Sequence, residues 1–130
     1  MLTDVAYIRI LQQLVPDSTI LPCYALFTIV FDEIDTGISG EVALRMGQLI
    51  LGMSKGHQIL MITHSPQIAA HADHQYHVSK ITSGKKDISA IQQLDGKQRI
   101  NEIAKMLSGD PPSAAAIKNA ESLVSSVKKK

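Results

Sequence analysis

Two short apolar runs separated by an amphipathic stretch constrain the fold of this chain more than any other feature. The first run, Leu26 to Phe31, is continuous and rich in β-branched residues, which predicts a strand buried on both faces, as in parallel sheets. The second run is Gln58 to Thr63. Together with the helix expected between them, they form a βαβ unit, so the two strands should be parallel and should end at the same edge of an α/β sheet.

The helix between the two runs is predicted from apolar residues that recur three and four positions apart. It should open at Ser39 or Gly40 and end near Ser54, before Gly56. The residues expected on its buried face are Val42, Met46, Leu49, Ile50 and Met53.

The residues after the second run predict four further elements. These are a short helix over 65–72 that begins with Ser65 and Pro66, a β-hairpin with its turn at 83–86, a helix over 100–107 closed by Gly109, and a last helix from about Ser113. The basic residues 128–130 are expected to form a disordered tail.

The N-terminal segment, residues 1–27, has a weaker pattern. Five apolar residues could form one face of a helix that stops before Pro16: Val5, Ile8, Leu11, Leu14 and Val15.

Composition limits the chain to one domain or part of one. Its 130 residues can bury a core, although a complete nucleotide-hydrolysing domain usually needs more. The net charge of +1 gives no global electrostatic reason to expect nucleic acid or a membrane as a partner. Cys23 is the only cysteine and no apolar run is long enough to span a bilayer, which favours the reducing cytoplasm.

Acidic residues cluster directly after the first predicted strand, at Asp32, Glu33 and Asp35. Open α/β sheets bind ligands at the carboxyl ends of their strands, where a cation or water makes such charge tolerable. A hydrophobic run into Asp-Glu is the Walker B pattern, in which the Asp holds Mg²⁺, usually through water, and the Glu polarises the water that attacks the γ-phosphate. Asp32 and Glu33 are candidates for these roles, but the pattern is short and also fits a solvated acidic turn.

His64 ends the second predicted strand. The βαβ topology brings it to the same edge as Asp32 and Glu33, where an imidazole could contact a γ-phosphate. A lone histidine at a strand end is more often a capping or packing residue, so it is the pairing with the two carboxylates that favours a functional role.

Three stretches of the sequence resemble, in order and spacing, the C-terminal part of the RecN family of SMC-like bacterial DNA-repair ATPases. They are "IVFDEIDTGISGEVA", "QILMITHSPQIAAHADHQYHVSK" and "RINEIAKMLSG", and the resemblance runs over residues 28–127. It implies the C-terminal portion of a P-loop NTPase, an ABC ATPase head, that binds ATP and Mg²⁺ in double-strand-break repair. Its implied partners are a second head in a homodimer and DNA, and its implied location is the nucleoid.

The resemblance also implies roles for individual residues. Asp32 and Glu33 become the Walker B pair, with Asp32 binding Mg²⁺ through water and Glu33 catalytic. His64 becomes the catalytic switch histidine. Asp35, Ser39 and Gly40 fall in the D-loop region, where they would help to bind the nucleotide at the interface between heads.

Two elements of such a head are missing from the sequence. No window fits G-x-x-x-x-G-K-[ST], the phosphate-binding loop, and no signature stretch precedes Asp32. Residues 1–27 do not resemble the helix expected there. Either this segment has diverged from the family or the reading frame is truncated or misassigned, and we favour the second alternative. The chain thus carries half of one active site, and we expect it not to hydrolyse ATP alone.

Two other kinds of function compete with this interpretation. His71, His74 and His77, beside Asp73, could converge on a transition metal, although exposed polar residues are the commoner outcome. A non-catalytic interaction module is also open, because an incomplete fold exposes apolar surface and strand edges that favour self-association. Direct DNA binding has weaker support, since the tight basic clusters are confined to Lys85-Lys86 and 128–130.

Overall fold

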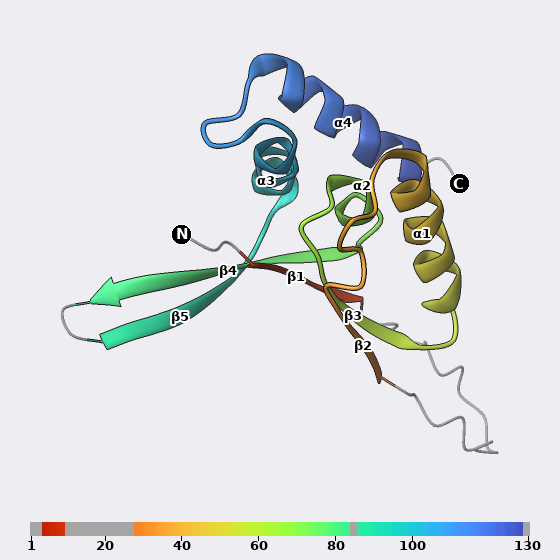
Figure 1. Ribbon diagram of the computed structural model, residues 1–130, viewed down its shortest axis with the longest axis horizontal. Coiled ribbons are helices and arrows are strands. Elements are labelled where there is room, and N and C mark those ends of the chain that lie inside the picture. Colours follow the sequence, from red (N-terminus) through yellow and green to blue (C-terminus); the bar gives the residue numbers. More distant parts are fainter. Residues whose placement is uncertain (1–3, 10–27, 84–85, 129–130) are drawn as a thin grey trace, which may run out of the picture.

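The structure is a computed structural model that describes residues 4–9, 28–83 and 86–128 (Figure 1). In chain order the elements are β1 (Asp4–Arg9), β2 (Thr28–Asp32), α1 (Gly40–Met53), β3 (Gln58–Ile62), α2 (Pro66–Ala69), β4 (His74–Ser83), β5 (Lys86–Gln93), α3 (Gly96–Ser108) and α4 (Ala114–Lys128). The predicted hairpin and all four predicted helices after residue 38 are confirmed. Lys128, which was predicted in the disordered tail, is instead the last residue of α4. The hairpin turn at 84–85, the rest of the predicted tail at 129–130 and the start of the first apolar run lie outside the described residues.

The strands form one mixed sheet in the order β2-β3-β1-β4-β5. β2 and β3 are parallel, with Thr28 opposite Gln58 and Asp32 opposite Ile62. The other neighbouring strands are antiparallel. The βαβ unit is therefore confirmed, but it supplies only one parallel pair, and the sheet is not the parallel one that the first apolar run suggested.

Residues 4–9 are a strand, so the predicted N-terminal helix is wrong for this part of the chain. β1 lies between β3 and β4, with Ala6 opposite both Ile62 and Tyr76. Because β1 lies between two strands, the backbone groups on both of its edges have hydrogen-bond partners. A short isolated helix of the same residues would have only marginal stability in water. The remainder of that predicted helix, residues 10–15, lies outside the described residues.

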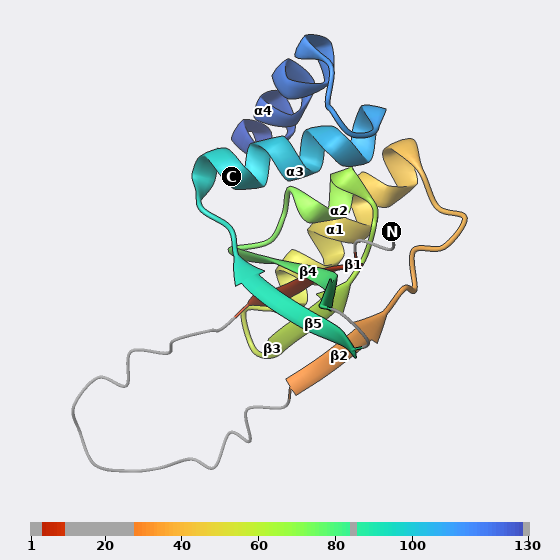
Figure 2. The same cartoon turned by 90° about the vertical axis from the view of Figure 1, so that its left-hand side faces the viewer.

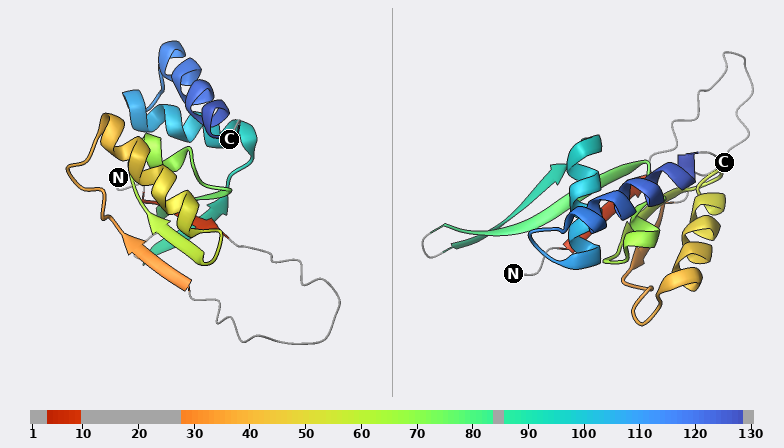
Figure 3. Two further views of the ribbon diagram at one scale, coloured as in Figure 1. Left: turned by 90° about the vertical axis from the view of Figure 1, so that its right-hand side faces the viewer. Right: turned by 90° about the horizontal axis from the view of Figure 1, so that it is seen from above.

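The described helices all cover the same face of the sheet (Figures 1 and 2). They contact one another in the order α1, α2, α3, α4 (Figure 3). The core lies between this helical layer and the sheet, and many of its residues are small, which allows the helices to approach closely. It comprises Ala43, Met61, Ile68, Ala69, Ala70, Ile103, Ala104, Ala116, Ala120 and Val124. Within the described ranges, no helix is long and apolar enough to cross a membrane.

β2 is not buried on both faces, contrary to the prediction from its apolar run. It is an edge strand, and its residues alternate between exposed and partly buried. Phe31 packs against the core, while Val30 points to the other face and is 56% exposed. The error arises because a continuous apolar run shows neither that a strand lies at an edge nor that helices cover one face only.

The buried face of α1 also differs from the predicted one. Ala43 and Gly47 are its buried residues, whereas Val42 and Leu49 are 61% and 65% exposed. Met46 and Ile50, which were predicted on the buried face, do pack against the core. The helix is rotated from the orientation that its large apolar residues suggest because its small residues allow close contact with α2 and His71.

The start of α3 is fixed by contacts that the apolar pattern did not show. Asp95 and Gln98 form a capping box: the Gln98 N–H donates to Asp95 Oδ1 at 2.8 Å, and the Asp95 N–H donates to Gln98 Oε1 at 3.0 Å. Arg99 donates to the carbonyl oxygens of Ala69 and Ala70 at 3.3 and 2.8 Å. The guanidinium thus binds the carboxyl end of α2, where a positive charge is favourable, and ties α3 to α2.

Gly47 provides a test of this packing. A Cβ added there would lie 2.5 Å from Nδ1 and 2.9 Å from Cε1 of the buried His71 ring. We expect Gly47→Ala to lower the free energy of unfolding by about 1–3 kcal/mol, because overpacking outweighs the gain in helix propensity. Denaturant titration of the purified chain measures this.

Gly52→Ala is the matched control in the same helix, because a Cβ at Gly52 meets nothing within 4 Å. It should be neutral or should stabilise by up to about 1 kcal/mol. Equal effects of the two substitutions would contradict the packing of α1 on His71.

Candidate functional site

The carboxyl ends of β2 and β3 lie side by side, as the βαβ prediction requires. Asp32 is opposite Ile62 in the parallel register, and the Glu33 N–H donates to the Ile62 carbonyl at 3.0 Å. His64 follows two residues after Ile62. The side chains of Asp32, Glu33 and His64 are all exposed, so the edge is open to a ligand.

The segment after β2 folds into tight turns that lead to α1. Glu33 adopts the left-handed conformation, with φ of +48°, and its carbonyl accepts from the Thr36 N–H at 3.3 Å and from the Thr36 hydroxyl at 2.8 Å. The Ile38 N–H donates to the Asp35 carbonyl at 3.0 Å. Gly37 also has a positive φ, +80°. A side chain is sterically strained in the left-handed conformation that Glu33 adopts. Such strained residues occur often in functional segments.

Asp35 does not share the exposure of the other predicted site residues. It is 2% exposed, and its Oδ2 accepts a hydrogen bond from the Thr63 hydroxyl. The Thr63 oxygen in turn accepts from the Ser65 N–H at 3.0 Å. Asp35, predicted to bind the cofactor, therefore lies inside the protein and links the turn after β2 to the turn after β3.

Sequence reasoning missed Thr63 and Ser65 as parts of this region. A threonine directly before His64, opposite an acidic turn, is a weak signal, because Thr is also common in strands for its shape alone. The hydroxyl acquires its role only when β2 and β3 are paired in this register.

Ser39 and Gly40 form the entry to α1. Both are exposed, and the Ser39 side chain, although at the N-cap, makes no capping hydrogen bond. Gly40 has a φ of +59°. The positive end of the helix dipole thus lies in the same connection as the acidic turn, with an exposed hydroxyl at its start.

The exposed carboxylates are chemically suited to Mg²⁺, which prefers oxygen ligands and keeps several waters. They do not make a complete site by themselves: among the described residues, no group of three or more His, Cys, Asp or Glu side chains is arranged to hold a metal ion. A magnesium ion here would need ligands from a phosphate and from water, as in nucleotide-dependent sites.

The three histidines of the alternative metal site contact separate partners. His71 is buried and donates from Nδ1 to the Gln67 carbonyl at 2.8 Å, so the expectation that it is an exposed polar residue is wrong. His74 Nδ1 accepts from Gln93 Nε2 at 3.2 Å. His77 takes part in a different cluster.

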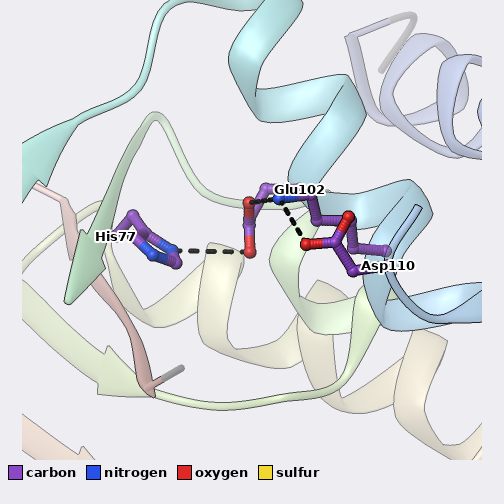
Figure 4. Close-up of polar contacts among 4 residues, drawn as sticks. His77, Glu102 and Asp110 are labelled. Carbon is purple, nitrogen blue, oxygen red and sulfur yellow. Dashed lines mark ion pairs between the residues drawn. The ribbon is translucent and has the colours of Figure 1, made fainter. Parts of the chain in front are cut away.

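His77 faces α3 (Figure 4). Its Nδ1 lies 3.4 Å from Glu102 Oε1. Lys105 Nζ forms ion pairs with Glu102 Oε2 at 3.7 Å and with Asp110 Oδ2 at 3.3 Å. This partly buried cluster connects β4, α3 and the loop before α4, so the geometry places His77 in a contact between these elements.

Comparison with known proteins found several DNA repair proteins named RecN. That of Haemophilus influenzae is 34% identical over 114 residues, covering 88% of this chain and 20% of the relative. That of Streptomyces coelicolor is 36% identical over 97 residues, covering 75% of this chain and 17% of the relative. That of Xylella fastidiosa is 48% identical over 82 residues, covering 63% of this chain and 15% of the relative. The chain thus spans a fifth or less of the length of these relatives, and no protein-family model matches it.

The left-handed conformation of Glu33 yields a stability test. Glycine adopts this conformation without the cost of about 1–2 kcal/mol that a side chain imposes. Since glycine also gains entropy in the unfolded chain, we expect Glu33→Gly to raise the free energy of unfolding by a net amount of about 0.5–1 kcal/mol.

The same substitution at Glu121, an exposed residue of α4, is the control. Glu121→Gly should destabilise by about 0.5–1 kcal/mol, because glycine is unfavourable inside a helix. Urea unfolding of both variants decides the matter, and a loss of stability in Glu33→Gly would contradict the strained turn.

Proposed function

This chain belongs by sequence to the RecN family of DNA repair proteins, and we propose that residues 28–127 form the C-terminal lobe of an ATP-hydrolysing head. The observation that carries this proposal is the parallel pairing of β2 and β3, which brings Asp32, Glu33 and His64 to one open edge. An acidic pair and an imidazole at adjacent strand ends suit the binding and hydrolysis of a magnesium-bound nucleotide.

We assign a separate role to each exposed residue of this edge. Asp32 would hold Mg²⁺ through water, and the ion would offset the charge of the phosphates. Glu33 would accept a hydrogen bond from the attacking water and orient it toward the γ-phosphate. His64 would donate a hydrogen bond to that phosphate.

Ser39 and Gly40 are the D-loop residues that we propose to face the nucleotide of a second head, because both are exposed at the start of α1. Asp35 belongs to the same segment, but its carboxylate is buried, so we do not assign it to nucleotide binding. In the intact protein, two heads would enclose ATP between them, and hydrolysis would couple to the handling of DNA ends in the cytoplasm and nucleoid.

The 130-residue chain carries only half of such a site, because its sequence has no phosphate-binding loop or signature. Without those backbone amides and the lysine, the carboxylates of Asp32 and Glu33 would repel a triphosphate. We therefore expect no ATP turnover by the chain alone. A phosphate-release assay with Mg²⁺ checks this, and turnover by the chain would overturn the half-site assignment.

The roles can be tested in a chimera in which residues 28–127 replace the matching segment of the Haemophilus influenzae RecN. If the chimera hydrolyses ATP, Glu33→Gln should lower kcat by a factor of about 10²–10⁴, as expected for loss of a general base. Glu41→Gln is the control: Glu41 is also an exposed glutamate near the edge, but it pairs with Arg45 at 2.7 Å on the surface of α1. Equal rates for the two variants would refute the role of Glu33.

A second candidate function is association with another copy of the chain. By strand register, Val30, Leu60 and Ile91 lie on the sheet face opposite the helices, and Ile91 is 71% exposed. Exposed apolar side chains on such a face, which is bounded by the edge strands β2 and β5, favour protein association.

Sedimentation of the purified chain tests this second function. We expect a dimer that Val30→Lys converts to monomer, because the lysine would place a charge in the contact. Leu49→Lys is the control, since Leu49 is 65% exposed but lies on α1. A monomeric parent chain, or equal effects of both lysines, would exclude the sheet face as a dimer interface.

A further inference from the structure

A chain of hydrogen bonds joins the turn after β2 to both neighbours of His64. Asp35 Oδ2 accepts from the Thr63 hydroxyl, and the Thr63 oxygen accepts from the Ser65 N–H at 3.0 Å. His64 lies between Thr63 and Ser65 in the sequence. The carboxylate of Asp35 is therefore linked to the side chain of Thr63 and, through that hydroxyl, to the backbone N–H of Ser65, the residues on either side of the histidine.

These contacts are shielded from water, whereas the histidine is not. Asp35 and Thr63 are each 2% exposed and Ser65 is 6% exposed, while His64 is exposed. Buried hydrogen bonds have no competing water and hold their geometry closely. An exposed imidazole is thus carried on a short, internally fixed stretch of backbone.

A backbone hydrogen bond fixes the other side of the edge. The Glu33 N–H donates to the Ile62 carbonyl at 3.0 Å, directly before Thr63. Together with the bond from Thr63 to Asp35, this contact sets the position of the turn that carries Glu33 relative to the turn that carries His64. Small displacements of reacting groups reduce rates strongly, so such a connection has consequences for catalysis.

We propose that Asp35 is a positioning residue of the ATPase site, which acts through Thr63 to hold His64 in place relative to Glu33. This inference rests on the proposed function. Asp35 contacts no nucleotide in this role. Its effect is on the geometry of the hydrolytic step rather than on nucleotide affinity, so its loss should change kcat more than KM.

The chain contains a matched control for the Thr63 hydroxyl. Thr28 lies at the opposite end of the same strand pair, and its hydroxyl donates to Gln58 Oε1 at 2.8 Å. Thr28 thus links β2 to β3 through a side-chain hydrogen bond, as Thr63 links the turns that follow these strands, but Thr28 is exposed and far along the strands from His64. Replacing either by valine removes one hydroxyl and keeps the branched shape.

The first experiment measures steady-state ATP hydrolysis by the chimera described above. Thr63→Val should lower kcat by a factor of about ten to a hundred, with KM for ATP changed less than about twofold. Thr63→Ser, which retains the hydroxyl, should restore most of kcat, and Thr28→Val should match the parent. Asp35→Ala combined with Thr63→Val should be no slower than either single variant, because the two residues act as one unit.

The second experiment uses the 130-residue chain and does not depend on ATP hydrolysis. Amide hydrogen exchange should accelerate at Ser65 in Thr63→Val and remain unchanged there in Thr28→Val. An unchanged Ser65 amide in Thr63→Val would overturn the inference even if the chimera failed to fold.

The outcomes separate this inference from the proposed function. If Glu33→Gln and His64→Ala abolish turnover while Thr63→Val keeps the parental kcat, the positioning role of Asp35 is wrong and the ATPase assignment stands. If Glu33→Gln retains full turnover, the ATPase assignment fails and the positioning role fails with it. If Thr28→Val lowers kcat as much as Thr63→Val does, the loss of activity comes from a general loss of stability of the strand pair, and this result would also overturn the inference.

Discussion

The parallel pairing of β2 with β3 is the interaction on which the rest of this arrangement depends. Its register places Asp32 opposite Ile62, so the residues that follow each strand meet at one edge. A shift of one residue would turn the side chains of β2 to the opposite face and would separate Thr63 from Asp35. The buried hydroxyl-carboxylate contact therefore depends on the register and also helps to fix it.

The one-sided placement of the helices explains both the close packing and the exposed surface. Small residues such as Ala43 and Gly47 allow α1 to approach His71, which shifts larger apolar residues of the helix to the outside. The opposite face of the sheet carries Val30 and Ile91 without a covering helix among the described elements. This chain, which spans a fifth or less of its RecN relatives, has its core on one side of the sheet and exposed apolar side chains such as Val30 and Ile91 on the other.

Much of the fold could be predicted because it follows from local patterns. The βαβ unit, the hairpin and the helix closed by Gly109 each have a periodicity or a turn residue that specifies them. The prediction failed where the structure or burial of a segment depends on neighbouring segments. Residues 4–9 form a strand because two other strands flank them, and Val30 is exposed because β2 lies at an edge. His71 is buried by the approach of α1, which no local pattern indicates.

The candidate site divides in the same way. The sequence by itself determined that Asp32, Glu33 and His64 lie at the carboxyl ends of two strands, because a strand, a crossover helix and a strand in succession are typical of a parallel pair. Only the tertiary structure decided that Asp35 is buried on Thr63 instead of facing a ligand. The physical reason is that a strand-end position depends on chain topology, whereas the burial of one side chain depends on register and on the atoms that other segments bring against it.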